Sequence, residues 1–281
     1  PKAGQGMNVS MADTFNLGWK LAAVLKGQAD PALLRSYSNE RRAKAQELID
    51  FDRDMAHLFS VKPTSATEAD QFQRYFKRHG RYTAGVETQY DASTITGSDA
   101  HQALATGLEV GKRFHSAPVI RLADAKPMQL GHAFKADGRW RLIGFAPAGD
   151  HGHPDGAIGR LCAALAGDKD SPLLRYTPKG ADIDSVIDLR AVFQQSHRTL
   201  ALDGLPAPLL PAKGRYGLTD YEKVFCADTL HGPDIFDLRG IDRKHGALVV
   251  LRPDQFIAQV LPLGDISALT GFFAGFLRPV A

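Results

Sequence analysis

The chain has 281 residues, of which 44% are hydrophobic and 23% are charged, as in an ordinary globular protein of one large or two modest domains. Its formal net charge is only +3, and lysines and arginines are interleaved with acids, so nucleic-acid binding gains little support. Cys162 and Cys226 form no C-x-x-C motif, and no apolar run is long enough to cross a bilayer. The start also lacks the pattern of a signal peptide, so we expect a cytoplasmic protein without a membrane partner.

The first element predicted in chain order is a helix over residues 8–26. Ser10-Met11-Ala12-Asp13 fits a capping box, and Gly27 closes the segment as a C′ residue. Between them, residues recur at helical spacing, namely Phe15, Gly18, Leu21, Ala22 and Leu25. One continuous helix therefore accounts for this stretch.

A glycine turn, Gly4-Gln5-Gly6, precedes this helix. Glycines let the backbone approach a ligand closely, and a helix start leaves several N–H groups without internal partners. Such a geometry binds anions, for example a phosphate or flavin oxygen. A tight turn that packs the helix on a neighbour explains the same motif, and on the motif alone we favour that interpretation.

A second helix is predicted after Asp30 and Pro31, which combine an N-cap residue with a first-turn proline. Its apolar face is marked by Ala45, Leu48, Phe51, Met55 and Leu58. Two helices then fill residues 8–59 without a sheet to cover them. We therefore expect them to pack on a domain encoded upstream.

Charged residues on the second helix form a candidate anion site, with Glu40, Arg41 and Arg42 near Lys44 and Glu47. The spacing from Glu40 to Lys44 also suits an ordinary exposed ion pair on a helix. We favour a solvated helix face here.

Residues 63–100 show a looser pattern. One short helix is predicted through Phe72 and Phe76, and polar sequence with glycine and threonine follows. We interpret the segment as a linker that wraps the surface.

Beyond residue 101 the periodicity changes to that of strands. Residues 119–122 are predicted as one strand, and residues 129–134 and 140–145 as a hairpin that turns at Asp137-Gly138. An Asp-Gly pair is a strong signal for a hairpin turn.

The remainder alternates between helix and strand. A helix is predicted at 156–165, a strand at 186–193, and a second hairpin whose strands at 247–251 and 256–261 flank Arg252-Pro253-Asp254-Gln255. The closing helix carries an apolar stripe of Ile266, Leu269, Phe272, Phe273 and Phe276. The alternation predicts an α/β layer.

Two other groups of residues could carry chemistry. His151-Gly152-His153, between Asp150 and Asp155, is a candidate for a divalent metal by residue type, but we favour a solvated polar loop and predict no metal site. Cys162 and Cys226 are interpreted as small core residues rather than nucleophiles.

Two regions carry a resemblance to a known family. PKAGQGMNVSMADTFNLGWKLAAVL followed by LLRSYSNERRAKAQELIDFDR resembles the final FAD-contacting segment of flavin-dependent aromatic hydroxylases, the family of phenol 2-monooxygenase and 3-hydroxybenzoate 4-monooxygenase. KADGRWRLIGFAP, YEKVFCAD, GIDRKHGALVVLRPDQFIAQVLPL and the closing helix resemble the thioredoxin-like C-terminal domain of the same family.

The resemblance implies an α/β fold in three parts. Residues 1–62 would be the C-terminal helices of a FAD-binding domain, 63–100 a linker, and 101–281 a thioredoxin-like dimerisation domain without the CxxC motif. The chain opens at Pro1 without an initiator Met and without the Gly-Asp motif that precedes this helix in the family, so it is expected to be a C-terminal fragment. A G-x-G-x-x-G fingerprint on a strand is also missing, so the chain by itself is expected to hold FAD poorly.

The resemblance also implies site residues. The amides of Met7 and Asn8 would point at the pyrimidine edge of the flavin, after a turn made by Gly4 and Gly6. The backbone of Pro1 would lie near the flavin carbon that takes up oxygen, which makes Pro1 both a cofactor contact and the candidate catalytic residue.

As a complete protein, the expected activity is ortho-hydroxylation of a phenolic substrate, of the phenol or 3-hydroxybenzoate type, by a homodimer that uses FAD, NADPH and O2. The alternative is a non-catalytic thioredoxin-like interaction or dimerisation protein whose first two helices form a docking arm. A thioredoxin-type redox protein is not favoured, because the cysteines are not paired.

Overall fold

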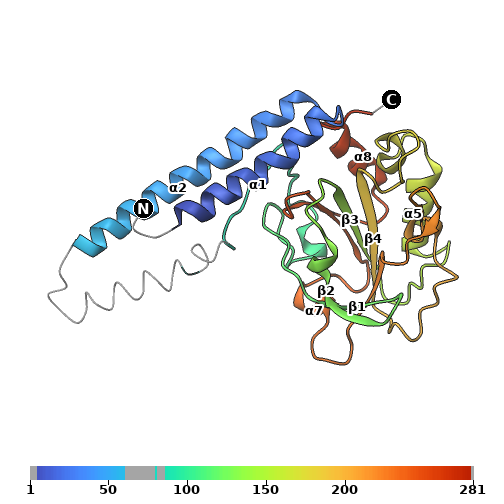
Figure 1. Cartoon of the computed structure of the whole chain (residues 1–281). Coiled ribbons are helices and arrows are strands. Elements are labelled where there is room, and N and C mark those ends of the chain that lie inside the picture. The colour runs from blue at the N-terminus through green and yellow to red at the C-terminus, as the bar shows by residue number, and fades with distance from the viewer. Residues whose placement is uncertain (1–4, 61–79, 81–85, 280–281) are drawn as a thin grey trace.

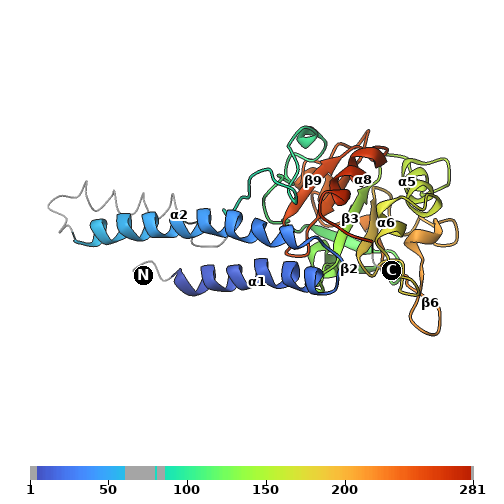
Figure 2. The ribbon, with the colours of Figure 1, turned by 90° about the horizontal axis from the view of Figure 1, so that it is seen from above.

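A computed structural model of the chain describes residues 5–60, 80 and 86–279, and shows a long helical hairpin attached to an α/β body. Helices α1 and α2 lie side by side in both Figure 1 and Figure 2, and one end of the pair rests on the body. The helical segments are α1 (Gly6–Leu25), η1 (Pro31–Leu34), α2 (Arg35–Ser60), η2 (Gln102–Leu104), η3 (Leu130–Ala133), α5 (Ala157–Gly167), α6 (Pro172–Arg175), η4 (Ala207–Leu209), α7 (Ile235–Leu238) and α8 (Ile266–Ala274).

Helix α1 confirms the predicted helix but begins a turn earlier than the capping box implied. Its N-cap is Gln5, and Ser10 lies inside the helix, where its carbonyl oxygen accepts a bond from the Thr14 hydroxyl. The capping-box prediction was wrong because the chain is already helical at Gly6, and Asp13 is engaged by Arg41 instead, at 2.5 Å.

The end of α1 follows the prediction. Gly27 has a φ of +70°, a conformation that glycine adopts without the Cβ penalty. Its amide bonds to the carbonyl of Val24, and the amide of Gln28 bonds to that of Ala23. These are the two bonds of a Schellman motif.

The second helix begins as predicted at Asp30, whose carboxylate accepts from the amide of Ala32 before η1 passes into α2. Phe51 and Met55 are buried on the predicted apolar face, whereas Ala45 is exposed. The short helix predicted through Phe72 and Phe76 lies outside the described residues.

The body contains a mixed seven-stranded sheet with the order β2-β1-β7-β4-β3-β8-β9, plus a small β5–β6 ribbon. The strands are β1 (Pro118–Arg121), β2 (Lys126–Gln129), β3 (Trp140–Phe145), β4 (Ile187–Phe193), β5 (Ala212–Lys213), β6 (Leu218–Thr219), β7 (Val224–Ala227), β8 (Ala247–Leu251) and β9 (Ile257–Leu261). Strand β3 pairs in parallel with β4 and antiparallel with β8.

The hairpin predicted around Asp137-Gly138 was wrong. A turn is present there, with Gly138 at φ +84°, but β2 pairs with β1 and not with β3. Every residue of β3 is buried, so this strand needs partners on both sides and belongs in the middle of the sheet. Strand β2 contains Pro127 and is mostly exposed, which suits an edge.

Other predicted elements are confirmed within a residue or two: α5, β4, the β8–β9 hairpin and α8. The four core positions predicted for α5 are all buried, namely Ile158, Leu161, Cys162 and Leu165. Strand β7 was not predicted, because four residues among polar neighbours give little periodic signal.

Alternate residues of the central strands supply two hydrophobic cores, one on each face of the sheet. In β3, Trp140 and Leu142 join the core under α5 and α8, whereas Ile143 and Phe145 face the opposite core. The first core continues into the helical hairpin: Trp19 of α1 packs edge-on against Trp140, with ring centroids 5.6 Å apart. The base of the hairpin is therefore part of the body's core.

Backbone hydrogen bonds also fasten this base. The amide of Asp30 bonds to the carbonyl of Phe276, and the amide of Arg278 bonds to the carbonyl of Gln28, both at 2.9 Å. An Arg278–Asp30 ion pair lies beside them. The far ends of α1 and α2 extend beyond the body (Figure 2).

Candidate functional site

The start of α1 brings together the described residues of the predicted glycine turn. Val9 is the first residue whose amide bonds inside the helix, to the carbonyl of Gln5 at 3.0 Å. The amides of Gly6, Met7 and Asn8 precede it, so helix geometry directs them outward along the axis. Among the described residues, the first turn carries no acidic side chain and Gln5 makes no side-chain cap bond. Within residues 5–60, the positive end of the helix therefore has no side-chain cap, which suits an anion.

Of the predicted site residues, the structure places Gly6, Met7 and Asn8 at this helix start. Met7 is 71% exposed, and the Asn8 amide nitrogen donates to Gln5 Oε1 at 3.0 Å. Pro1 and Gly4 lie outside the described residues, so their roles stay predictions.

A cavity of about 530 Å³ lies beside this helix start, between the two helices and the body. Its walls combine apolar, polar and charged side chains, and include Asn8, Phe15, Arg41, Tyr90, Arg113 and Phe256. The body contributes through residues near 88–90, 113 and the β8–β9 turn. The start of α1 and the body therefore line the same cavity.

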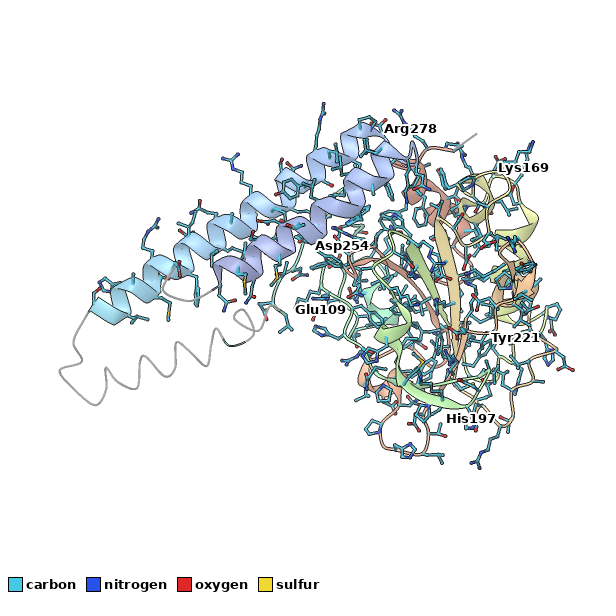
Figure 3. The ribbon with its side chains drawn as sticks, viewed as in Figure 1. Glu109, Lys169, His197, Tyr221, Asp254 and Arg278 are labelled. Atoms are coloured by element: carbon cyan, nitrogen blue, oxygen red, sulfur yellow. The ribbon has the colours of Figure 1, made fainter. Side chains whose placement is uncertain are left out.

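Behind the cavity, Arg252 of the β8–β9 turn forms a fully buried ion-pair system. It donates to both carboxylate oxygens of Glu40 on α2, at 2.5 and 3.0 Å. It also donates to both oxygens of Asp254, at 2.9 and 2.7 Å. Two-pronged contacts of this kind fix orientation as well as distance. Figure 3 labels Asp254 at the junction of the helices and the body.

Helix α1 joins the same system through Lys20 and Asn16. Lys20 Nζ lies 2.8 Å from Glu40 Oε2 and 2.7 Å from Asn16 Oδ1, and the Asn16 amide donates to Glu40 at 2.7 Å. Asn16 and Arg41 also donate to the hydroxyl of Tyr90, at 3.3 and 3.0 Å. We call the following set the interface network: Asn16, Lys20, Glu40, Arg41, Tyr90, Arg252 and Asp254.

The solvated-face interpretation of Glu40 and Arg41 was therefore wrong. Both are buried, and Glu40 pairs with Arg252 and Lys20 rather than with Lys44. Lys44 pairs with Glu47 at 2.6 Å instead. Helical spacing alone could not show that a cation from the distant β8–β9 turn approaches this face.

Electrostatics in the interface network follow from burial and pairing. Burial opposes ionisation of Glu40, but the charges and hydrogen bonds of Arg252 and Lys20 prevail and lower its pKa to about 2. Burial lowers the pKa of Lys20 to about 8, although Glu40 opposes the shift. Burial raises the pKa of Tyr90 against the opposing charge of Arg41. At neutral pH the carboxylate of Glu40 is thus ionised and Tyr90 is a neutral phenol.

The other candidate groups lie away from the cavity. His151 and His153 are exposed in the loop after β3, and no cluster of three or more metal-binding side chains occurs within residues 5–60 and 86–279. Cys162 and Cys226 are unpaired and buried, and burial raises the pKa of each thiol to about 12. The prediction that both are core residues is confirmed. Within the described part of the chain, no helix is long and apolar enough to cross a membrane.

Comparison with known families matches both halves of this arrangement. Residues 88–281 match the phenol hydroxylase C-terminal dimerisation domain, and residues 1–52 match a FAD binding domain. The first match alone covers well over half of the chain. The chain belongs to the phenol hydroxylase family.

Relatives within this family are flavin enzymes. The chain is 58% identical to 3-hydroxybenzoate 4-monooxygenase of Comamonas testosteroni, over 99% of this chain and 44% of that protein. It is 37% identical to the FAD-dependent monooxygenase terD of Aspergillus terreus, over 99% of this chain and 47% of the relative. A phenol 2-monooxygenase of Aspergillus fumigatus is 33% identical, over 98% and 45%. The chain spans just under half the length of these curated relatives.

Solved structures of two hydroxylases have a similar fold. An anhydrotetracycline hydroxylase from Streptomyces rimosus superposes with a TM-score of 0.53 at 21% identity, over 99% of this chain and 42% of that one. Aklavinone-11 hydroxylase, solved with FAD and aklavinone, gives a TM-score of 0.52 at 18% identity, over 96% and 40%. These likenesses concern the fold alone.

Sequence reasoning found the helix start but missed Asn16, Lys20, Tyr90 and Arg252. A weak signal was available: Asn16 and Lys20 are four residues apart on α1, so they share one face of the helix. Arg252 follows a strand of five apolar residues, which placed it in a turn but gave no sign of its burial.

Proposed function

We propose that this chain is the C-terminal part of a FAD-dependent monooxygenase that hydroxylates a phenolic substrate with NADPH and O2. The observation that carries the proposal is 58% identity to a 3-hydroxybenzoate 4-monooxygenase across almost the whole chain. The match of residues 1–52 to a FAD binding domain supports it independently. In this view residues 1–62 end the flavin domain, 63–100 are a linker, and 101–281 form the dimerisation domain of a cytoplasmic homodimer.

The residues at the start of α1 fit an isoalloxazine edge. Gly6 has no side chain to obstruct a planar ring, and the outward amides of Met7 and Asn8 suit electronegative ring atoms. When bound, FAD supplies the redox and oxygen-transfer chemistry that side chains lack. Met7 and Asn8 would orient the ring, and the positive helix end would stabilise negative charge on it. Gly4 and Pro1 remain proposed contacts, with Pro1 as the proposed catalytic residue.

The proposed position of attack is ortho to the phenol oxygen. In the name of the relative from Comamonas testosteroni, carbon 4 receives the oxygen and carbon 3 carries the hydroxyl group, and these two ring carbons are neighbours. Substrates of the 3-hydroxybenzoate type are favoured over plain phenol by the same relative.

For the body we propose a thioredoxin-like fold. The parallel β3–α5–β4 unit, followed by the antiparallel β8–β9 hairpin and α8 against α5, supports this assignment. The loop after β3 carries His151 and His153 where a thioredoxin would carry its cysteines, so the fold would serve assembly rather than dithiol exchange.

The test is a spectrum of the complete protein that contains this chain. We expect a flavin absorption band that NADPH bleaches faster with 3-hydroxybenzoate than without it, and a product with adjacent hydroxyl groups. A colourless protein of this chain's own mass would contradict the proposal and favour the interaction protein.

A substitution at the helix start tests the assigned contact. Gly6→Val in the complete enzyme should weaken FAD binding by about tenfold, or roughly 1.4 kcal/mol, because a branched side chain would obstruct the ring. Gly18→Ala, at an exposed position inside the same helix, is the control and should leave FAD binding unchanged. Equal FAD affinity in the Gly6→Val and wild-type enzymes would count against the contact.

A further inference from the structure

Arg252 connects the body to both helices from a position with no side-chain exposure. Its guanidinium lies between Glu40 of α2 and Asp254 of its own turn, and it also donates to Thr96 at 3.1 Å. The rings of Trp19 and Tyr90 lie 5.8 and 5.0 Å from it. One side chain of the body thus contacts α1, α2 and the segment that leads into the body.

The contacts continue from Arg252 toward the start of α1. Asp254 accepts from the indole nitrogen of Trp19 at 3.0 Å, and Glu40 accepts from Asn16. Arg41, bonded to Tyr90, donates to Asp13 at 2.5 Å and to the carbonyl of Val9 at 3.4 Å. Val9 follows Asn8 directly, so the interface network ends at the first turn of the helix.

These contacts fix the position of α1 along its own axis. Asp13, Asn16 and Lys20 follow one another at intervals of three and four residues, so they form a stripe on one helix face. Each makes a directional bond to α2 or to the junction with the body. A one-residue slide would move the stripe by about 1.5 Å and rotate it by about 100°, which breaks these bonds.

Charges of the interface network balance when Asp13, the partner of Arg41, is counted with them, and this balance lets the network stay buried. The cations of Lys20 and Arg252 face the carboxylates of Glu40 and Asp254, and Arg41 faces Asp13. Among the described residues, the buried side-chain atoms without a hydrogen-bond partner lie elsewhere, for example Asp184 Oδ1. Apolar side chains could hold the helices with similar stability, so the distinctive contribution of this network is a fixed geometry.

We propose that Arg252 is a positioning residue for the flavin end of α1, through which the dimerisation domain sets the place of the Met7 and Asn8 amides. The inference rests on the proposed function, because it assumes that these amides contact the flavin. It assigns the C-terminal body a part in the flavin site beyond assembly.

The test compares Arg252→Met with Lys223→Met in the complete enzyme. Lys223 is a similarly buried cation of the body, paired with Asp184 and Asp188 at 2.5 Å, and neither of these partners belongs to α1 or α2. Both variants should lower the melting temperature. Only Arg252→Met should weaken FAD binding by about tenfold, or roughly 1.4 kcal/mol, and lower the product formed per NADPH oxidised.

Arg252→Lys and Trp19→Phe extend the test to milder changes. Arg252→Lys keeps the charge but loses the two-pronged contacts with the carboxylates. Trp19→Phe removes the hydrogen bond to Asp254 and keeps a smaller aromatic ring beside Trp140. Both variants should fold and should lose less FAD affinity and less product per NADPH oxidised than Arg252→Met. Wild-type FAD affinity and coupling in all three interface variants would overturn the inference while leaving the proposed function intact. An equal loss in Lys223→Met would overturn it as well. A complete wild-type protein that binds no FAD would overturn the proposed function and this inference together.

Discussion

Glu40 remains ionised in a buried place because three neighbours hold its carboxylate. Arg252, Lys20 and Asn16 all donate to it within 3.0 Å. Removal of one charge from such a set leaves the opposite charges buried without a partner. The resulting loss of folding free energy is larger than the net free energy that the intact ion pair contributes. At the residue scale, the stability of the junction therefore depends on the protonation state of this one acid.

We predict that Glu40→Gln destabilises this chain by roughly 3 kcal/mol at pH 7. The folded pKa of about 2 lies below the ordinary value of 4.5, so the stabilisation is present above pH 4.5 and is lost as the pH falls toward 2. Urea unfolding at pH 7, 5 and 3 measures this effect. The difference in the free energy of unfolding between the variant and the wild type should be smallest at pH 3.

Glu47→Gln is the matched control, since Glu47 is half exposed and, within the described residues, forms an ion pair only with Lys44. It should change stability by less than about 0.5 kcal/mol at every pH. If Glu40→Gln lowered the free energy of unfolding by the same amount at pH 3 and pH 7, the charge of Glu40 would not be the source of the stabilisation.

At the scale of elements, the two termini of α1 have different tasks. The N-terminal end keeps its amides outward, whereas the C-terminal end is closed by the Schellman bonds at Gly27 and leads into the turn that packs on the body. Because that turn bonds to Phe276 and Arg278, the closing geometry of α1 also orients the helical hairpin on the body.

Two glycine substitutions in α1 should have opposite effects. Gly27→Ala should destabilise this chain by about 1 kcal/mol, because an L side chain is strained at φ +70°. Gly18→Ala should stabilise it by about 0.5–1 kcal/mol, since Gly18 lies inside the helix and a new Cβ would meet open space. Chemical unfolding measures the free energy of unfolding of both variants. A change in the same direction for both would contradict the assignment of Gly27 to the helix end.

At the scale of the molecule, the body leaves apolar side chains uncovered around the β5–β6 ribbon. Tyr216 and Leu218 are 70% exposed, and Tyr221 is 48% exposed. Exposed apolar groups that lie together commonly mark an interface. A dimerisation domain with such a ribbon suggests that a second copy covers it.

Sedimentation equilibrium of this chain should therefore give twice its mass of 30.5 kDa. Leu218→Glu should shift the population toward monomer, because a charge in an apolar contact must be desolvated. Leu25→Glu, at a 78% exposed position on α1, is the control and should leave the dimer unchanged. A monomer at all concentrations would contradict dimerisation, and a dimer unaffected by Leu218→Glu would place the interface elsewhere.

The sequence by itself determined the elements whose signals are local. Helical spacing and end signals located α1, α2, α5 and α8, and the apolar runs on either side of Arg252-Pro253-Asp254-Gln255 located β8 and β9. Gly6 also marked the beginning of α1, because a helix end depends mainly on its own few residues, whereas Gly4 lies outside the described residues.

Tertiary structure alone decided which elements and charges meet. The Asp-Gly turn was real, yet β3 lies in the sheet centre, where its two edges pair with β4 and β8 from distant sequence and its two faces are covered by the two cores. Glu40 looked like a surface residue until Arg252, 212 positions later, was placed beside it. Whether a charge is solvated or buried depends on groups brought close by folding, and periodicity along one helix does not contain that information.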